Sequence, residues 1–275
     1  MKKPMLVAFD LDDTLIGSDG QIAQANFSAL KQLAAAGVIA AAVTGRTFYE
    51  MPKVLRLNPL VPYVIYGDGA VAVNADGEKL FSSYYSKQRA LDVLHLLQRY
   101  DTMIEVFYGG RPYTSADQLN ASAYKYYRIE SVYHPVMEES RVPCADLEAL
   151  LAGKEQTEMF NVFFHLDRQR QDFIAKAEEL FPELLCTHSM QSNLEILQRH
   201  VNKGAALKKL AALLQISPCQ VLAVGDSCND LTMIDYAGTG LAVANACTQL
   251  KQAAQNVICS SDDGVLDYIY QHYVK

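Results

Sequence analysis

The stretch Met5-Leu-Val-Ala-Phe-Asp-Leu-Asp-Asp-Thr14 decides the fold of this chain. It begins with a short apolar run, which is typical of a strand buried on both faces of a sheet. Acidic residues follow at the point where the strand ends. Because Asp10 and Asp12 are two positions apart, extended backbone carries their side chains to the same side. We therefore expect a central strand with paired carboxylates at its carboxyl end.

The same pattern recurs along the chain and alternates with helices. Leu30, Leu33 and Ala34 recur at helical spacing, with Gly37 placed to cap a helix, and another helix is expected over Phe48 to Leu57. Strands that alternate with helices favour a parallel sheet with right-handed crossovers. The sequence thus predicts an α/β fold, a Rossmann-like doubly wound parallel sheet. The further expected strands are Val38–Val43, Tyr63–Tyr66, Val221–Val224, Leu241–Val243 and Val257–Ile258.

The middle of the 275-residue chain differs from the rest in composition and in hydrophobic pattern. Between Ser83 and Met190, tyrosines are frequent, and we expect short strands between amphipathic helices. We interpret residues 83–190 as an inserted α+β domain. The core is then split into residues 1–82 and 191–275.

Composition excludes several classes of function. Lysine plus arginine is 24 and aspartate plus glutamate is 31, a net charge of −7, which argues against a nucleic-acid groove. The six cysteines have no metal-binding or redox spacing, so we expect reduced thiols. The apolar stretch from Pro4 to Phe9 is too short for a signal peptide, and Leu33 to Val43 is about half a membrane span. These features favour a cytoplasmic protein with no membrane partner.

Acidic residues also follow the strand that ends at Val224, in Gly225-Asp226-Ser-Cys-Asn229-Asp230. The carboxyl ends of parallel strands meet at one crevice, so Asp10, Asp12, Asp226 and Asp230 are expected to converge. Two like charges about 4 Å apart repel by roughly 4 kcal/mol at an effective dielectric near 20. A hard divalent cation relieves that repulsion, and oxygen ligands of this kind suit Mg²⁺.

A basic residue at a helix start complements this acidic cluster. Asn202 is a good candidate for a helix N-cap, and Lys203 follows it directly. We expect the free N–H groups at the helix start and the lysine charge, with Thr44 and the backbone of Gly45, to form a phosphate cradle.

Four motifs in this order resemble the haloacid dehalogenase-like hydrolase superfamily. They are Asp10-Leu-Asp12-Asp13-Thr14, Thr44, Lys203 and Gly225-Asp226-Ser-Cys-Asn229-Asp230. The insertion has the position of the type II cap of that superfamily. Thr44-Gly45-Arg46, Asn202-Lys203-Gly204 and Asn245-Ala246 further resemble its Cof-type sugar-phosphatase branch.

The resemblance implies a Mg²⁺-dependent phosphatase that acts on small phosphorylated metabolites, such as sugar phosphates. Asp10 is then the nucleophile that forms an aspartyl-phosphate, and Asp12 the general acid and base. Lys203 is catalytic and binds phosphate. Thr44, Gly45, Arg46 and Asn229 complete the phosphate site, and the metal ligands are Asp10, Asp12, Asp226 and Asp230, the last through an oriented water. The inserted domain would select the substrate, in a monomer or homodimer.

The chain departs from the family pattern in places, and alternatives stay open. Asp68 stands where the family usually has Asn, and Cys228 occupies a position that is often acidic. Asp12 could instead cap a helix, and Arg46 could be a salt-bridge partner. A phosphohexomutase-type phosphotransferase and a catalytically silent binding protein on the same fold are the alternative functions.

Overall fold

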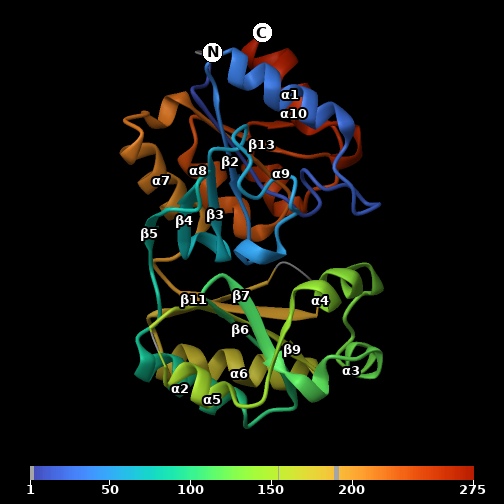
Figure 1. Cartoon of the computed structure of the whole chain (residues 1–275), viewed down its shortest axis with the longest axis vertical. Coiled ribbons are helices and arrows are strands. Elements are labelled where there is room, and N and C mark those ends of the chain that lie inside the picture. Colours follow the sequence, from blue (N-terminus) through green and yellow to red (C-terminus); the bar gives the residue numbers. More distant parts are fainter. Residues whose placement is uncertain (1–2, 154, 189–191) are drawn as a thin grey trace. The chain divides into compact units, whose positions relative to one another are not determined.

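The computed structural model describes residues 3–153, 155–188 and 192–275, and the chain divides into two compact units (Figure 1). We call the first the core unit: Met1–Gly45, Met51–Ser82 and Asn202–Lys275. The second, the inserted unit, comprises Arg46–Glu50 and Ser83–Val201. The core unit is therefore interrupted twice along the sequence, by residues 46–50 and by residues 83–201.

An eight-stranded sheet organises the core unit, with strand order β14-β13-β12-β1-β2-β3-β4-β5. The strands from β14 to β3 are parallel, and β4 and β5 add an antiparallel edge. The chain leaves the centre in one direction through β2 and β3 and in the other through β13 and β14, which is a doubly wound topology. The bounds are β1 Leu6–Phe9, β2 Ile39–Val43, β3 Tyr63–Tyr66, β4 Val71–Asn74, β5 Lys79–Ser82, β12 Val221–Gly225, β13 Thr239–Ala242 and β14 Asn256–Val257.

Helices cover both faces of this sheet (Figure 1). Helix α1 packs on α10 and on β2, whereas α7 packs on α8 and contacts β3 and β4. All four residues of β1 are buried, which confirms the expectation from their continuous apolar run. The bounds are α1 Gln24–Ala35, α7 Lys203–Leu213, α8 Leu231–Tyr236, α9 Thr248–Ala253 and α10 Val265–Ile269.

The inserted unit is an α+β module around a six-stranded sheet of order β10-β11-β9-β6-β7-β8. Its strands pair antiparallel except β7 with β8. Alternate residues of β9 point to opposite faces: Phe160, Val162 and Phe164 join the larger apolar cluster and Phe163 the smaller one. The bounds are β6 Thr102–Tyr108, β7 Arg111–Ser115, β8 Val142–Cys144, β9 Thr157–Phe164, β10 Leu184–Thr187, β11 Asn193–Gln198, α2 Lys87–Leu97, α3 Ala121–Tyr126, α4 His134–Ser140, α5 Leu147–Leu151 and α6 Asp167–Leu180.

Two expectations need correction. The helix expected over Phe48 to Leu57 is wrong: a short 3₁₀ turn, η1 (Phe48–Glu50), is followed by turns, because Pro52 cannot donate the hydrogen bond that a helix needs.

The expected boundary at residues 190 and 191 lies outside the described residues. Strand β11 pairs with β9 and β10, so the division falls after Val201 instead.

The helices of the described residues are all too short or too polar to cross a membrane. The six cysteines are free thiols, as their spacing led us to expect.

Candidate active site

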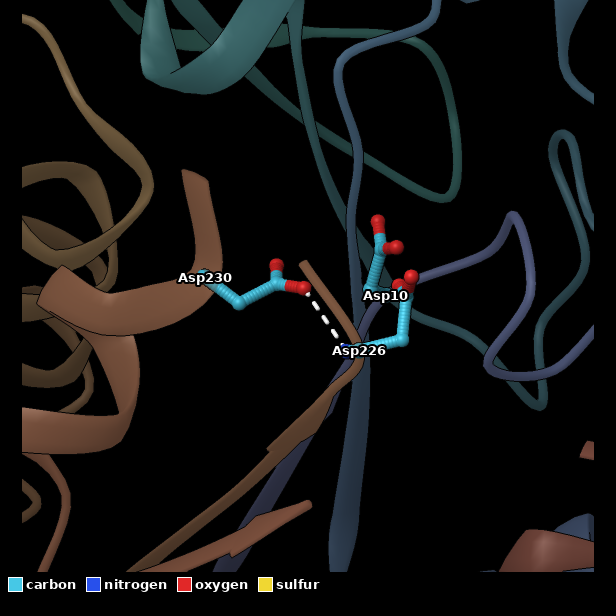
Figure 2. A group of neighbouring side chains, drawn as sticks. All are labelled: Asp10, Asp226 and Asp230. Carbon is cyan, nitrogen blue, oxygen red and sulfur yellow. Dashed lines mark hydrogen bonds between the residues drawn. The ribbon is translucent and has the colours of Figure 1, made fainter. Parts of the chain in front are cut away.

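The ends of two neighbouring strands build the centre of the site. Strands β1 and β12 are parallel, with Phe9 opposite Val224, and the amide of Asp10 donates to the Val224 carbonyl at 3.1 Å. Asp10 and Asp226 therefore leave the sheet at the same edge. Asp230 approaches from η6 (Cys228–Asp230), and Figure 2 shows the three carboxyl groups gathered there. One oxygen from each lies within 4.8 Å of the others.

Lys203 is the cation of this cluster. Its Nζ donates to Asp10 Oδ1 at 2.8 Å and to Asp230 Oδ1 at 2.7 Å, and the side chain is 1% exposed. Asn202 caps helix α7 as expected, since its Oδ1 accepts from the Ala205 amide at 2.8 Å. Burial opposes the lysine charge, but the charges of Asp10 and Asp230 dominate and hold the Lys203 pKa well above its usual value.

Both oxygens of Asp230 are engaged in hydrogen bonds. Oδ1 accepts from Lys203, while Oδ2 accepts from the amides of Asp226 at 2.9 Å and Ser227 at 3.1 Å. Ser227 and Asp230 thereby form a capping box that closes the turn after β12. This carboxylate fixes the Asp226 backbone and the lysine at once.

In the acidic centre, the ammonium group of Lys203 offsets only part of the charge that the clustered carboxyl groups would carry. Burial raises the pKa of Asp10 to about 7, and Lys203 only partly offsets this while Asp230 and Asp12 add to it. Burial, followed by the charges of Asp10 and Asp230, raises the pKa of Asp226 to about 10. Clustered carboxylate oxygens that resist ionisation suit a hard divalent cation such as Mg²⁺. The donor set of Asp10 and Asp226 therefore fits that metal.

The remaining residues of the first motif surround Asp226 and the chain turn. Thr14 Oγ1 donates to Asp226 Oδ1 at 3.1 Å. Asp12 is partly exposed, and its charge is one of the causes of the raised Asp10 pKa, so it lies close by. Asn245 Nδ2 donates to the Asp13 carbonyl at 2.6 Å, which joins the loop after β13 to this turn.

The residues after β2 and β3 form a second side of the site. The Thr44 side chain is buried, and its carbonyl accepts from the Asp68 amide at 3.1 Å. A methyl group on Gly45 would lie 3.2 Å from Asp68 Oδ1, so the loop passes close to this carboxylate. Asp68 Oδ1 also accepts from Asn229 Nδ2 at 3.1 Å. Thr44, Gly45 and Asn229 are thus brought together around Asp68.

Arg46 belongs to the inserted unit, whereas Thr44, Gly45 and Asn229 belong to the core unit. Its Nη1 donates to the Glu50 carbonyl at 2.9 Å. The side chain thus helps to hold the loop that follows Gly45, and a phosphate contact by Arg46 stays a prediction.

Sequence reasoning missed the contacts made by Thr14 and Asp68. Thr14 is part of the quoted motif, but its bond to Asp226 joins residues from opposite ends of the chain. Asp68 follows an apolar strand just as Asp10 does, and this placement was the signal that could have identified it. Its left-handed backbone (φ 51°, ψ 30°) suits the tight turn η2 (Gly67–Gly69).

Comparisons with known proteins identify the family of this chain. A family model described as haloacid dehalogenase-like hydrolase matches residues 7–269. The chain is 27% identical to phosphatase YwpJ of Bacillus subtilis, covering 97% of this chain and 99% of that protein. It is 29% identical to an HMP-PP phosphatase of Yersinia pseudotuberculosis, over 90% of this chain and 86% of that protein.

Among solved structures, a haloacid dehalogenase-like hydrolase from B. subtilis superposes with a TM-score of 0.83 at 28% identity. The match covers 98% of this chain and 99% of that one, so it includes both units. The order of motifs, the doubly wound sheet and the nearly full-length family match lead to one conclusion. This chain belongs to the haloacid dehalogenase-like hydrolase family and is a phosphatase of that family.

Proposed function

We propose that the protein hydrolyses small phosphomonoesters in a Mg²⁺-dependent reaction that passes through an aspartyl-phosphate on Asp10. The observation that carries this proposal is the position of Asp10. Its carboxyl group is buried, shares a cluster of carboxylate oxygens with Asp226, and is held by an ammonium group. A carboxylate can attack a phosphate dianion only where nearby cations offset the repulsion between them.

Asp10, the Asp12 carbonyl and Asp226 would hold the metal, with Thr14 fixing Asp226 through its hydrogen bond. When bound, Mg²⁺ neutralises charge on the transferring phosphoryl group and on the carboxylates around it. Asp230 contributes by position, because Lys203 and two main-chain amides occupy its oxygens. We therefore assign it to the metal site through an oriented water.

In the first step, Asp10 attacks phosphorus. Lys203 holds Oδ1, so Oδ2 is the oxygen that forms the new bond to phosphorus. The bond between phosphorus and the ester oxygen breaks, and Asp12 donates a proton to the leaving alcohol.

In the second step, the ionised Asp12 takes a proton from water, which attacks the phosphorus of the aspartyl-phosphate. The bond between phosphorus and Oδ2 breaks, so that Asp10 is regenerated and inorganic phosphate is released. Asp12 suits this exchange because it lies near Asp10 yet is partly exposed to solvent.

Lys203, Thr44, Gly45 and Asn229 would receive the charged phosphoryl oxygens, where fixed donors contribute most to catalysis of this reaction. Arg46, carried by the adjoining loop, would be a further contact. The inserted unit would select the substrate; from the sequence we predicted residues 83–190 for this domain. We recognise no sequence motif in it that names the substrate. Sugar phosphates are the first substrate class to test, together with the compound after which the Yersinia relative is named.

The test uses Asp10→Asn, with Asp235→Asn as a matched control because Asp235 is exposed on α8. Phosphate release from a generic aryl phosphate with Mg²⁺ should fall at least about a thousandfold in Asp10→Asn and stay unchanged in the control. Circular dichroism checks that both variants are folded. Turnover by Asp10→Asn at the wild-type rate would refute the assignment of the nucleophile. Transfer of phosphate to an added sugar hydroxyl would instead indicate a phosphotransferase.

A further inference from the structure

Asp68 is a buried acidic residue to which the mechanism above gives no role. It is 2% exposed and lies in η2, directly after β3. Its amide donates to the carbonyl of Thr44, and its carboxylate lies against Gly45 and Asn229. Asp68 therefore contacts three of the residues that we assign to the phosphate.

A hydrogen-bond donor and a positive charge act on the Asp68 carboxyl group. Asn229 Nδ2 donates to Oδ1 at 3.1 Å, and a carboxylate oxygen accepts such a bond well. Ser227 Oγ donates to the amide oxygen of Asn229 at 2.7 Å, which fixes the amide with its nitrogen toward Asp68. The charge of Asp68 also acts on Lys203, together with those of Asp10 and Asp230. An ammonium group nearby stabilises a carboxylate further.

A negative charge at this place has a cost for anion binding. The carboxylates of Asp10, Asp226, Asp230 and Asp68 all act on the charge of Lys203. A phosphate anion that contacts Gly45 and Asn229 would lie beside the Asp68 carboxylate and be repelled by it.

We propose that Asp68 tunes the affinity of the site for anions: its carboxylate weakens the binding of phosphate anions and so promotes release of inorganic phosphate. The residue acts through its charge and takes no part in bond making. This proposal rests on the proposed function, because it places the phosphate beside Thr44, Gly45 and Asn229.

The test compares the wild-type chain with Asp68→Asn, which keeps the shape of the side chain and an acceptor oxygen but removes the charge. Asn is also well suited to a positive φ. Binding of inorganic phosphate in the presence of Mg²⁺ is measured by isothermal titration calorimetry. Removing one like charge at close range should tighten phosphate binding roughly tenfold. In turnover assays, KM and the inhibition constant of phosphate should both fall, while kcat does not rise.

Asp235→Asn is the matched control, since it removes one charge from the exposed surface of α8 and should leave phosphate binding unchanged. Asp68→Ser removes the same charge with a smaller side chain and should also tighten binding. Unchanged or weaker phosphate binding in folded Asp68→Asn would overturn the proposal, as would failure of both Asp68 variants to fold. Phosphate binding needs no turnover, so an inactive wild-type protein would refute the proposed function separately.

Discussion

Removal of divalent cations should make the stability of this protein fall as the pH rises from 6 to 8. The carboxyl groups of Asp10 and Asp226 have pKa values of about 7 and about 10, both above the ordinary value of 3.8. Between pH 3.8 and about 10, the folded chain therefore binds more protons than the unfolded chain does. The free energy of unfolding then decreases as the pH rises, because the folded state binds more protons than the unfolded state and the proton concentration falls.

The size of the effect follows from these two groups. Asp226 stays protonated in the folded state over the whole interval, which lowers the free energy of unfolding by roughly 3 kcal/mol over the two pH units. Asp10 loses its proton halfway through the interval and lowers it by roughly 1 kcal/mol more. We expect the free energy of unfolding to fall by about 4 kcal/mol in total, as a property of the coupled pair.

Urea unfolding followed by circular dichroism, with a chelator present, measures this change at pH 6, 7 and 8. Asp226→Asn is the control: it removes the larger contribution and should flatten most of the slope. Saturating Mg²⁺ should reverse the trend, since metal ligands bind in their ionised form. A metal-free stability that is constant or rises with pH, or an equal slope in Asp226→Asn, would show that the acidic centre is not short of positive charge.

Two further predictions concern stability. Arg141 is buried between Glu105 and Glu50, and its Nε lies 2.6 Å from Glu105 Oε1, so Arg141→Met should destabilise the inserted unit by about 3–5 kcal/mol. Urea unfolding measures this loss, and adding Glu105→Gln and Glu50→Gln should recover much of it; no recovery would contradict the buried-charge explanation. Gly204→Ala would place a methyl group 2.2 Å from the Thr232 carbonyl oxygen, where α7 crosses α8. Unfolding should become easier by about 1–3 kcal/mol, and unchanged stability would show that the two helices separate readily.

The sequence by itself determined the core of the fold and the members of the acidic centre. A continuous apolar run predicted β1, and the alternation of strands with helices predicted a parallel sheet. Strand direction then required that Asp10 and Asp226 emerge at one edge, because the carboxyl ends of parallel strands lie together. Asn202 was readable as a cap since capping depends on neighbours in sequence. These features are local, or follow from the direction of the chain.

Only the tertiary structure decided which polar groups are hydrogen-bond partners. Three contacts join distant segments: the bond of Thr14 to Asp226, the placement of Asp68 against Asn229 and the bond of Lys203 to Asp230. Strand β11 and residues 46–50 likewise belong to the inserted unit because of their partners there. Periodicity reports which face of an element is apolar, but a polar side chain takes its partner from whatever packing brings within hydrogen-bond distance.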